Sequence, residues 1–191
     1  MADERQAREA EAALHLTNAL LAAVDAYIGR QPGGEMPVAV VADGVAGLAG
    51  FVAASGVEEL RTAGEGLDAE QLPLEMCRVL LGTLGGEADD AGDSPLLMGG
   101  LPEAEIAQAQ ALREALEEVL DERAQQETLS VDVVVDAVGD LLMRTLRRVV
   151  QQLAQAGDTD GARTRLVTCY RLVQQSLETL ATGDLEAKDG A

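Results

Sequence analysis

Apolar residues recur at alternating intervals of three and four through most of this chain, which is the period of an α-helix. Two neighbouring apolar seams follow this period in residues 3–30: Ala10, Leu14, Thr17, Leu21, Val24 and Ile28, and beside them Ala13, Leu16, Leu20, Ala23 and Tyr27. A face made of two seams is wide enough to contact two other helices at once. The pattern therefore predicts an all-α protein that begins with a long helix.

Glycine and proline divide the rest of the chain into further amphipathic segments. We expect helices over residues 37–55, 72–84, 102–126 and 130–156, a short turn of helix at 57–62, and a last helix that ends near Gly183. Ser130 is a suitable N-cap for the helix that follows it. The expected fold is a bundle of five to six helices with up-and-down character.

The apolar stripes of these helices identify the expected core. They hold Val38, Val41, Val45, Leu48 and Val52; Ile106, Ala109, Leu112, Leu116 and Val119; Val135, Val138, Leu142, Leu146, Val149 and Leu153; and Leu166, Cys169, Tyr170, Val173, Leu177 and Leu180. Because only five residues, Gly157 to Gly161, separate the last two helices, we expect an antiparallel αα-hairpin at the C-terminus. Residues 1–183 are predicted to form one domain with an acidic, flexible loop at 85–102, and residues 184–191 a disordered tail.

Charge and composition exclude several classes of partner. The net charge is −20, whereas nucleic acids and anionic membranes both attract a basic surface. The chain has no Trp, one Phe and two Tyr, which leaves few rings on which bases could stack. No signal peptide is evident, and Asp or Gly interrupts the apolar stretches before the ~20 residues of a membrane span. We therefore expect a cytoplasmic protein that binds neither nucleic acid nor membrane, with Cys77 and Cys169 reduced and buried.

The segment Val38–Gly50 resembles the strand, glycine turn and helix of dinucleotide-binding enzymes. It departs from their pattern at the first glycine position, which is Ala42, and at Asp43, whose carboxylate would face the pyrophosphate. The favoured interpretation is a helix whose glycines, Gly44, Gly47 and Gly50, form a strip of small residues where another helix approaches closely. No cofactor is expected.

Asp89, Asp90 and Asp93 match the D-D-x-x-D motif, and the chain resembles isoprenoid diphosphate synthases in this pentapeptide and in being helical. In that family the motif holds Mg²⁺, so these three aspartates are the candidate metal ligands. The family places them on a helix, however, whereas Gly92 and Pro95 disfavour a helix here. A solvated acidic loop is the simpler interpretation.

His15 is the only histidine, which limits the chemistry that the chain can perform. A di-iron site in a helical bundle takes two E-x-x-H motifs, and a closed zinc site takes several Cys or His ligands. His15 falls on the polar face of its helix with Glu11 one turn before it, so we expect an exposed, weakly paired side chain. No catalytic residue can be assigned, and the sequence favours a protein without enzymatic activity.

One basic cluster stands out in this acidic chain, and it supplies the candidate partner-binding residues: Arg144, Arg147, Arg148, Arg163 and Arg165. The alternative interpretation is helix electrostatics, since Asp140 and Arg144 are four residues apart and cations are favoured near a helix C-terminus. Residues 130–183 hold six arginines against six acids, so almost all of the negative charge lies in residues 1–129. The last two helices are therefore where we expect a partner to bind.

Two functional classes remain open. The first is a non-catalytic protein-interaction module, such as an adaptor, an assembly chaperone or an oligomerising scaffold, which binds a protein partner or itself. In size, acidity and helix content the chain resembles helical secretion and assembly chaperones, although it carries no motif of theirs. The second class is a small-molecule enzyme that depends on carboxylates and a divalent metal, or a helical bundle that binds a ligand.

Overall fold

The computed structural model describes residues 2–63, 102–126, 128–158, 160–161, 163–171 and 173. Its elements are α1 (Ala2–Gly29), the short 3₁₀ helix η1 (Pro32–Gly34), α2 (Val38–Ala63), α4 (Glu103–Gln126) and α5 (Val131–Gln155). Residues 160–161, 163–171 and 173 are helical as well, and no strand occurs among the described residues. The expected all-α bundle is confirmed. The helix expected at 72–84, the loop before Pro102 and the tail at 184–191 lie outside the described residues.

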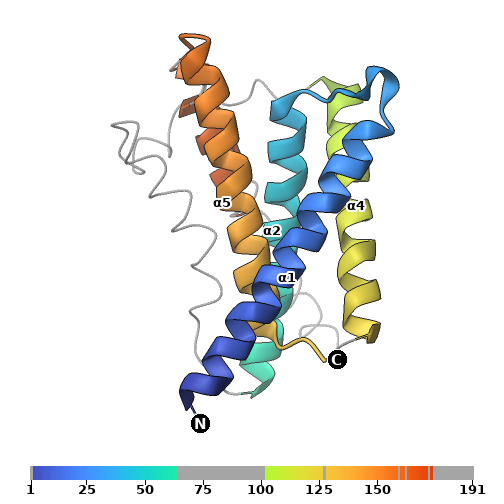
Figure 1. Cartoon of the computed structure of the whole chain (residues 1–191). Coiled ribbons are helices and arrows are strands. Elements are labelled where there is room, and N and C mark those ends of the chain that lie inside the picture. The colour runs from blue at the N-terminus through green and yellow to red at the C-terminus, as the bar shows by residue number, and fades with distance from the viewer. Residues whose placement is uncertain are drawn as a thin grey trace, which may run out of the picture.

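The four long helices form a bundle in which α1 and α2 each pack against both α4 and α5 (Figure 1). The wide apolar face of α1 thus contacts two neighbours, as its two seams predict. Helices α1 and α5 run in one direction and α2 and α4 in the other (Figure 1). The pairs that are consecutive among the described helices, α1 with α2 and α4 with α5, are each antiparallel, in agreement with the expected up-and-down character.

Leucine, valine and alanine fill the core, and its largest fully buried side chains are Leu20, Leu48, Leu112, Leu116, Leu141, Leu142, Leu146 and Leu166. Three residues placed in the expected stripes are instead exposed: Ala10, Leu14 at 50% and Ile106 at 43%. Ile106 lies in the first turn of α4, and the α1 seam of Leu14 is buried or partly buried only from Thr17 onward. The Thr17 hydroxyl donates to the carbonyl oxygen of Ala13 at 2.9 Å and lies 3.3 Å from that of Ala137 on α5.

Helix boundaries mostly follow the sequence signals. Ser130 caps α5, because its hydroxyl accepts a hydrogen bond from the backbone N–H of Val133 at 3.4 Å. The exception is α2, which continues to Ala63 where the sequence predicts a helix that ends at Ser55 and a separate turn after it. Ser55 and Gly56 are weak helix formers, but tertiary packing of α2 against α4 and α5 outweighs this local preference.

The glycines of α2 lie where α4 approaches it most closely. A Cβ atom on Gly44 would come within 2.9 Å of the Ala109 carbonyl oxygen and 3.0 Å of Leu112 Cδ2. A Cβ on Gly47 would lie 3.2 Å from Cδ of Arg113. The predicted strip of small residues is therefore confirmed at these two positions. The likeness to a dinucleotide-binding turn does not hold, because residues 38–50 are helical and Gly44 packs inside the bundle.

Two helical stretches, Glu4–Gly29 and Val38–Ser55, are long and apolar enough to cross a membrane by length and composition alone, although Asp43 and several glycines interrupt the second. From the sequence, Asp and Gly are expected to break every apolar stretch before it reaches the length of a membrane span. By length and composition, that expectation is wrong for these two stretches. About 67% of the second stretch is buried within the bundle, as in a core helix, against 28% of the first.

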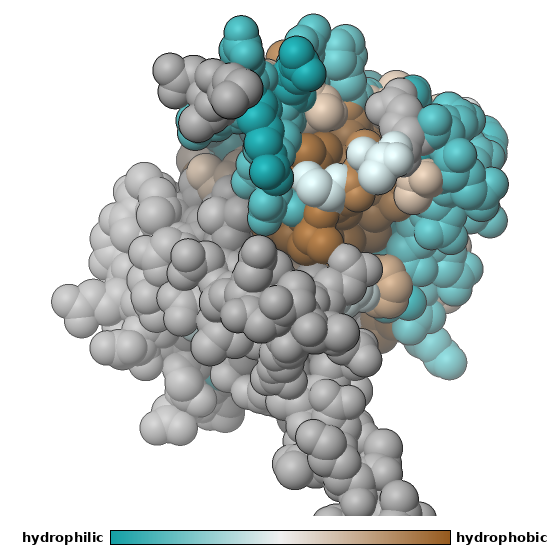
Figure 2. All heavy atoms as spheres, turned by 90° about the horizontal axis from the view of Figure 1, so that it is seen from below, coloured by the Kyte–Doolittle hydropathy of each residue, from teal (hydrophilic) through white to brown (hydrophobic). Residues whose placement is uncertain are grey.

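Seen from the end at which α1 begins, the surface shows hydrophobic side chains in a hollow between hydrophilic ridges (Figure 2).

Candidate functional site

A buried ion pair joins α2 to the residues that follow α5. Nη1 of Arg165 donates to both carboxylate oxygens of Asp43, at 3.0 and 2.9 Å. The side chains are 9% exposed at Asp43 and 21% exposed at Arg165. An ion pair this sheltered from water holds its two segments together more firmly than a surface pair does. It therefore fixes residues 163–171 against α2.

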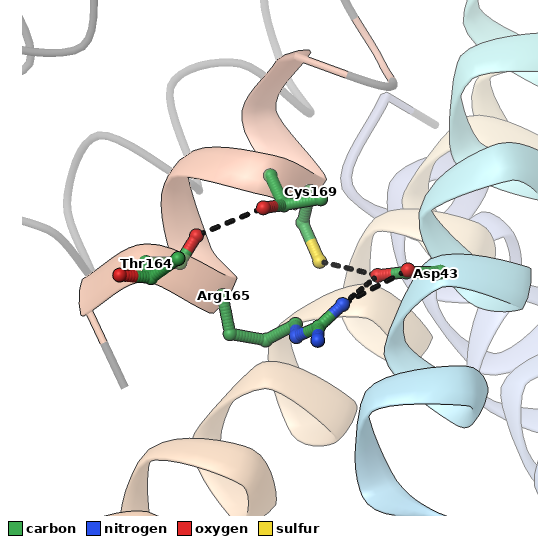
Figure 3. Close-up of polar contacts among 5 residues, drawn as sticks. Asp43, Thr164, Arg165 and Cys169 are labelled. Atoms are coloured by element: carbon green, nitrogen blue, oxygen red, sulfur yellow. Dashed lines mark hydrogen bonds and ion pairs between the residues drawn. The ribbon is translucent and has the colours of Figure 1, made fainter. Parts of the chain in front are cut away.

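Cys169 lies one helical turn after Arg165 and belongs to the same cluster (Figure 3). It is fully buried, and its Sγ is 3.9 Å from Oδ1 of Asp43. Its predicted burial is thereby confirmed, whereas Cys77 lies outside the described residues. Burial raises the pKa of the Asp43 carboxyl above its ordinary value of 3.8, although Arg165 and Cys169 oppose the shift. The negative charge of Glu105 on α4 raises this pKa further.

The end of α5 determines where this cluster lies. Gly157 has a positive φ of 77°, and the N–H groups of Gly157 and Asp158 donate to the carbonyl oxygens of Ala154 and Leu153 at 3.0 and 2.8 Å. This pair of bonds is a Schellman motif, which ends the helix and turns the chain. Oδ1 of Asp158 then accepts a hydrogen bond from the N–H of Gly161 at 2.8 Å, and helical structure resumes at residue 160.

A cavity of about 350 Å³ lies between α2, the end of α5 and four residues that follow it, Asp158, Gly161, Thr164 and Arg165. Aliphatic side chains and four kinds of polar group line it: Val38, Ala39, Val149, Leu153, Gln152, Asp158, Gly161, Thr164 and Arg165. Its volume falls in the lower part of the range of small-molecule sites, roughly 300 to 1,000 Å³. A mainly apolar wall with an arginine and an aspartate is suited to a small amphipathic molecule.

The five arginines of the predicted partner-binding cluster differ in their surroundings. Arg144 is half-exposed and bonds Asp140, with Nη2 at 2.8 Å and Nε at 3.0 Å from Oδ2, which raises its pKa. Arg147 and Arg148 are exposed on α5, and Arg163 is exposed after it. Arg165 turns inward to Asp43 and is unsuited to a surface contact. The predicted i,i+4 pair Asp140–Arg144 is confirmed, and Arg147 and Arg148 remain as the adjacent exposed cations.

His15 has the surroundings that its position predicts. Its side chain is 79% exposed, and Nε2 is 3.9 Å from Oε1 of Glu11, which is a weak contact. Within the described residues no three His, Cys, Asp or Glu side chains are arranged to hold a metal ion. The candidate ligands Asp89, Asp90 and Asp93 lie outside the described residues.

The fold and the cluster thus define an all-helical bundle with a buried ion pair beside a small cavity. The sequence matches no protein-family model, and comparisons with the curated proteins and with the solved structures find no match either.

Proposed function

We propose that this chain is a non-catalytic helical protein-interaction module, which acts as an adaptor, an assembly chaperone or an oligomerising scaffold. Arg147 and Arg148 carry the proposal: they are adjacent, exposed and without an ion pair to any described residue, in a chain of net charge −20. Guanidinium groups bind carboxylates in a bidentate geometry that lysine cannot reproduce. The occupant that fits this patch is an acidic protein segment, contributed by another protein or by a second copy of this chain.

Electrostatics also restrict how such a segment can approach. An acidic partner is repelled by the strongly negative residues 1–129 and attracted only where the arginines gather. Wrong orientations are therefore disfavoured, and charge complementarity determines both the register and the rate of association. This role needs no catalytic residues, since the arginine patch acts by binding alone.

A C-terminal antiparallel hairpin, formed by α5 and the residues after it, is part of the proposal. Three observations support it: the Schellman motif at Gly157, the capping of the next helix by Asp158, and the cavity that both segments line. The Asp43–Arg165 pair would then hold the second arm of the hairpin on α2, so that the exposed arginines lie on a rigid support.

We also propose a cytoplasmic location without membrane insertion. Its support is the burial of α2, whose apolar stretch is mostly covered by the bundle. The acidic charge supports it too, because anionic lipid surfaces repel such a protein.

A ligand-binding helical bundle is the second candidate function, and the cavity beside Arg165 favours it. The two candidates use different residues, since neither Arg147 nor Arg148 lines the cavity. They are therefore separable by mutation.

Size-exclusion chromatography with light scattering, combined with affinity capture by the full chain, tests the first proposal. We expect either a dimer or larger oligomer, or a stoichiometric partner whose capture depends on Arg147 and Arg148. A monomer that retains no partner through these arginines would contradict it.

A further inference from the structure

We propose that the cavity between α2 and the end of α5 binds a small aliphatic zwitterion, of which an α-amino acid with a branched apolar side chain is the representative. The inference rests on the second candidate function, ligand binding, and it names the ligand class. It is argued from two charged side chains that line the cavity, Arg165 and Asp158, and from the aliphatic side chains that line it with them.

Among the lining residues, Arg165 supplies the group that would hold a carboxylate. Its Nη1 is occupied by Asp43, whereas Nε and Nη2 make no hydrogen bond within the part of the chain that the structure describes. These two nitrogens face away from Asp43 (Figure 3). The Nε and Nη2 edge of a guanidinium is one that carboxylates bind with two parallel hydrogen bonds. Because Asp43 already fixes the side chain, little conformational entropy is lost when a ligand binds.

Asp158, in the same lining, supplies the group that would hold an ammonium group. One of its oxygens accepts the Gly161 N–H at 2.8 Å, and a carboxylate has lone pairs for further donors. The same negative charge, in a chain of net charge −20, repels a ligand that is only an anion. A ligand that carries both charges satisfies Arg165 and Asp158 together, with no net charge brought into the cavity.

Aliphatic side chains form much of the remaining lining, together with Gln152 and Thr164. Val38 and Ala39 come from α2, and Val149 and Leu153 from α5. They offer apolar surface without aromatic rings, which suits a short branched chain better than a flat ring system. The cavity of about 350 Å³ restricts the ligand to a small molecule.

Isothermal titration of the full chain with three probes tests the proposal: L-leucine, 4-methylpentanoate, which lacks the ammonium group, and isoamylamine, which lacks the carboxylate. We expect L-leucine to bind with a Kd on the order of 10 μM to 1 mM, given its size. Each half-ligand should bind at least about tenfold more weakly, because one charged hydrogen-bonding end is lost. Binding of 4-methylpentanoate or isoamylamine as tight as that of L-leucine would overturn the proposal.

Two variants locate the site. Ala39→Leu adds volume to the cavity wall on a helix that tolerates leucine, and should abolish L-leucine binding. Ala26→Leu makes the same change at an exposed position of α1 and should leave binding unchanged. Asp158→Asn keeps an acceptor for Gly161 but removes the charge, so it should weaken L-leucine and leave 4-methylpentanoate equal or tighter. L-leucine binding that survives in folded Ala39→Leu, or is unaltered by Asp158→Asn, would refute the assignment.

A fragment screen of the wild-type chain separates the ligand class from the ligand-binding function. In one outcome, fragments bind the wild-type chain and not the Ala39→Leu variant, while L-leucine binds neither. That result would overturn the proposed zwitterionic ligand class and leave the ligand-binding function in place. If neither L-leucine nor any fragment binds, both the ligand class and the second candidate function fail.

Discussion

Arg165 and Asp43, which are 122 residues apart in the sequence, form an ion pair in which one guanidinium nitrogen bonds both carboxylate oxygens at 2.9 and 3.0 Å. The pair lies at the contact between α2 and the residues after α5, largely away from solvent. Removing one member of such a pair leaves the other buried without compensation, which costs more than removing both. The packing of the C-terminal residues on the bundle thus depends on both side chains together.

A double-mutant cycle measures this dependence. Arg165→Met leaves the Asp43 carboxylate without its cation, and we expect the free energy of unfolding to fall by about 2 to 4 kcal/mol, below the full cost for a completely buried pair. Asp43→Asn combined with Arg165→Met should lose about 1 to 3 kcal/mol less than the two single changes added together. Urea denaturation followed by circular dichroism gives these values, and additive losses would show that the pair is not coupled.

The raised pKa of Asp43 predicts how stability changes with pH. An acid whose pKa is higher in the folded chain than in the unfolded chain adds stability fully below its unfolded value of 3.8, and loses it as the pH rises through the folded pKa. The pKa of Asp136 is raised as well, by burial and by the negative charges of Asp132 and Glu9, so Asp136 changes stability with pH in the same direction. We therefore expect the melting temperature to fall as the pH rises from 3.8 through the folded pKa of these two groups.

Asp43→Asn should make that fall shallower, because asparagine cannot lose a proton. Thermal unfolding between about pH 3.5 and pH 8 measures the slope. The matched control is Asp25→Asn, which removes the same charge from an exposed position of α1. A wild-type slope in Asp43→Asn would mean that Asp43 does not contribute to the pH dependence.

Sequence periodicity predicted most of the fold because the buried stripes are long and regular. The stripe from Val135 to Val149 is buried as expected, and the boundaries of α1, α4 and α5 fall within two residues of those expected. The choice of neighbours, with α1 and α2 each packed against both α4 and α5, could not be predicted in this way. Periodicity shows which face of a helix is buried, but it does not show which helix covers that face or in which direction it runs.

The buried cluster was harder to predict than the fold. Asp43 was interpreted only as an obstacle to phosphate binding and Arg165 only as a surface cation, whereas the two residues bind each other. A signal was nevertheless present, because one carboxylate in the long apolar stretch Val38–Ala54 requires a buried partner. Which cation supplies it depends on tertiary packing over 122 residues, and helical period carries no information at that range.

Gly44 and Gly47 should respond differently to substitution by alanine. At Gly44 the new Cβ would meet a backbone carbonyl at 2.9 Å, which cannot move without shifting α4, so we expect a loss of about 1 to 3 kcal/mol. At Gly47 the new Cβ would meet only the flexible Arg113 side chain at 3.2 Å. Alanine there should be neutral or stabilise the helix by up to about 1 kcal/mol. Urea denaturation of both variants tests the difference, and equal stabilities would contradict the close approach of α4 at Gly44.

Reversing the charges of Arg147 and Arg148 should abolish partner binding while preserving the fold, because both side chains are exposed. Arg147→Glu with Arg148→Glu replaces attraction by repulsion, and we expect at least a tenfold loss of affinity that diminishes as salt is added. The control is Arg8→Glu with Arg123→Glu, which changes the net charge by the same amount at exposed positions on α1 and α4. Light scattering and capture of the partner by each variant provide the measurement. If the control pair weakens binding as much as the α5 pair does, net charge rather than this patch determines association, and the proposed docking site is wrong.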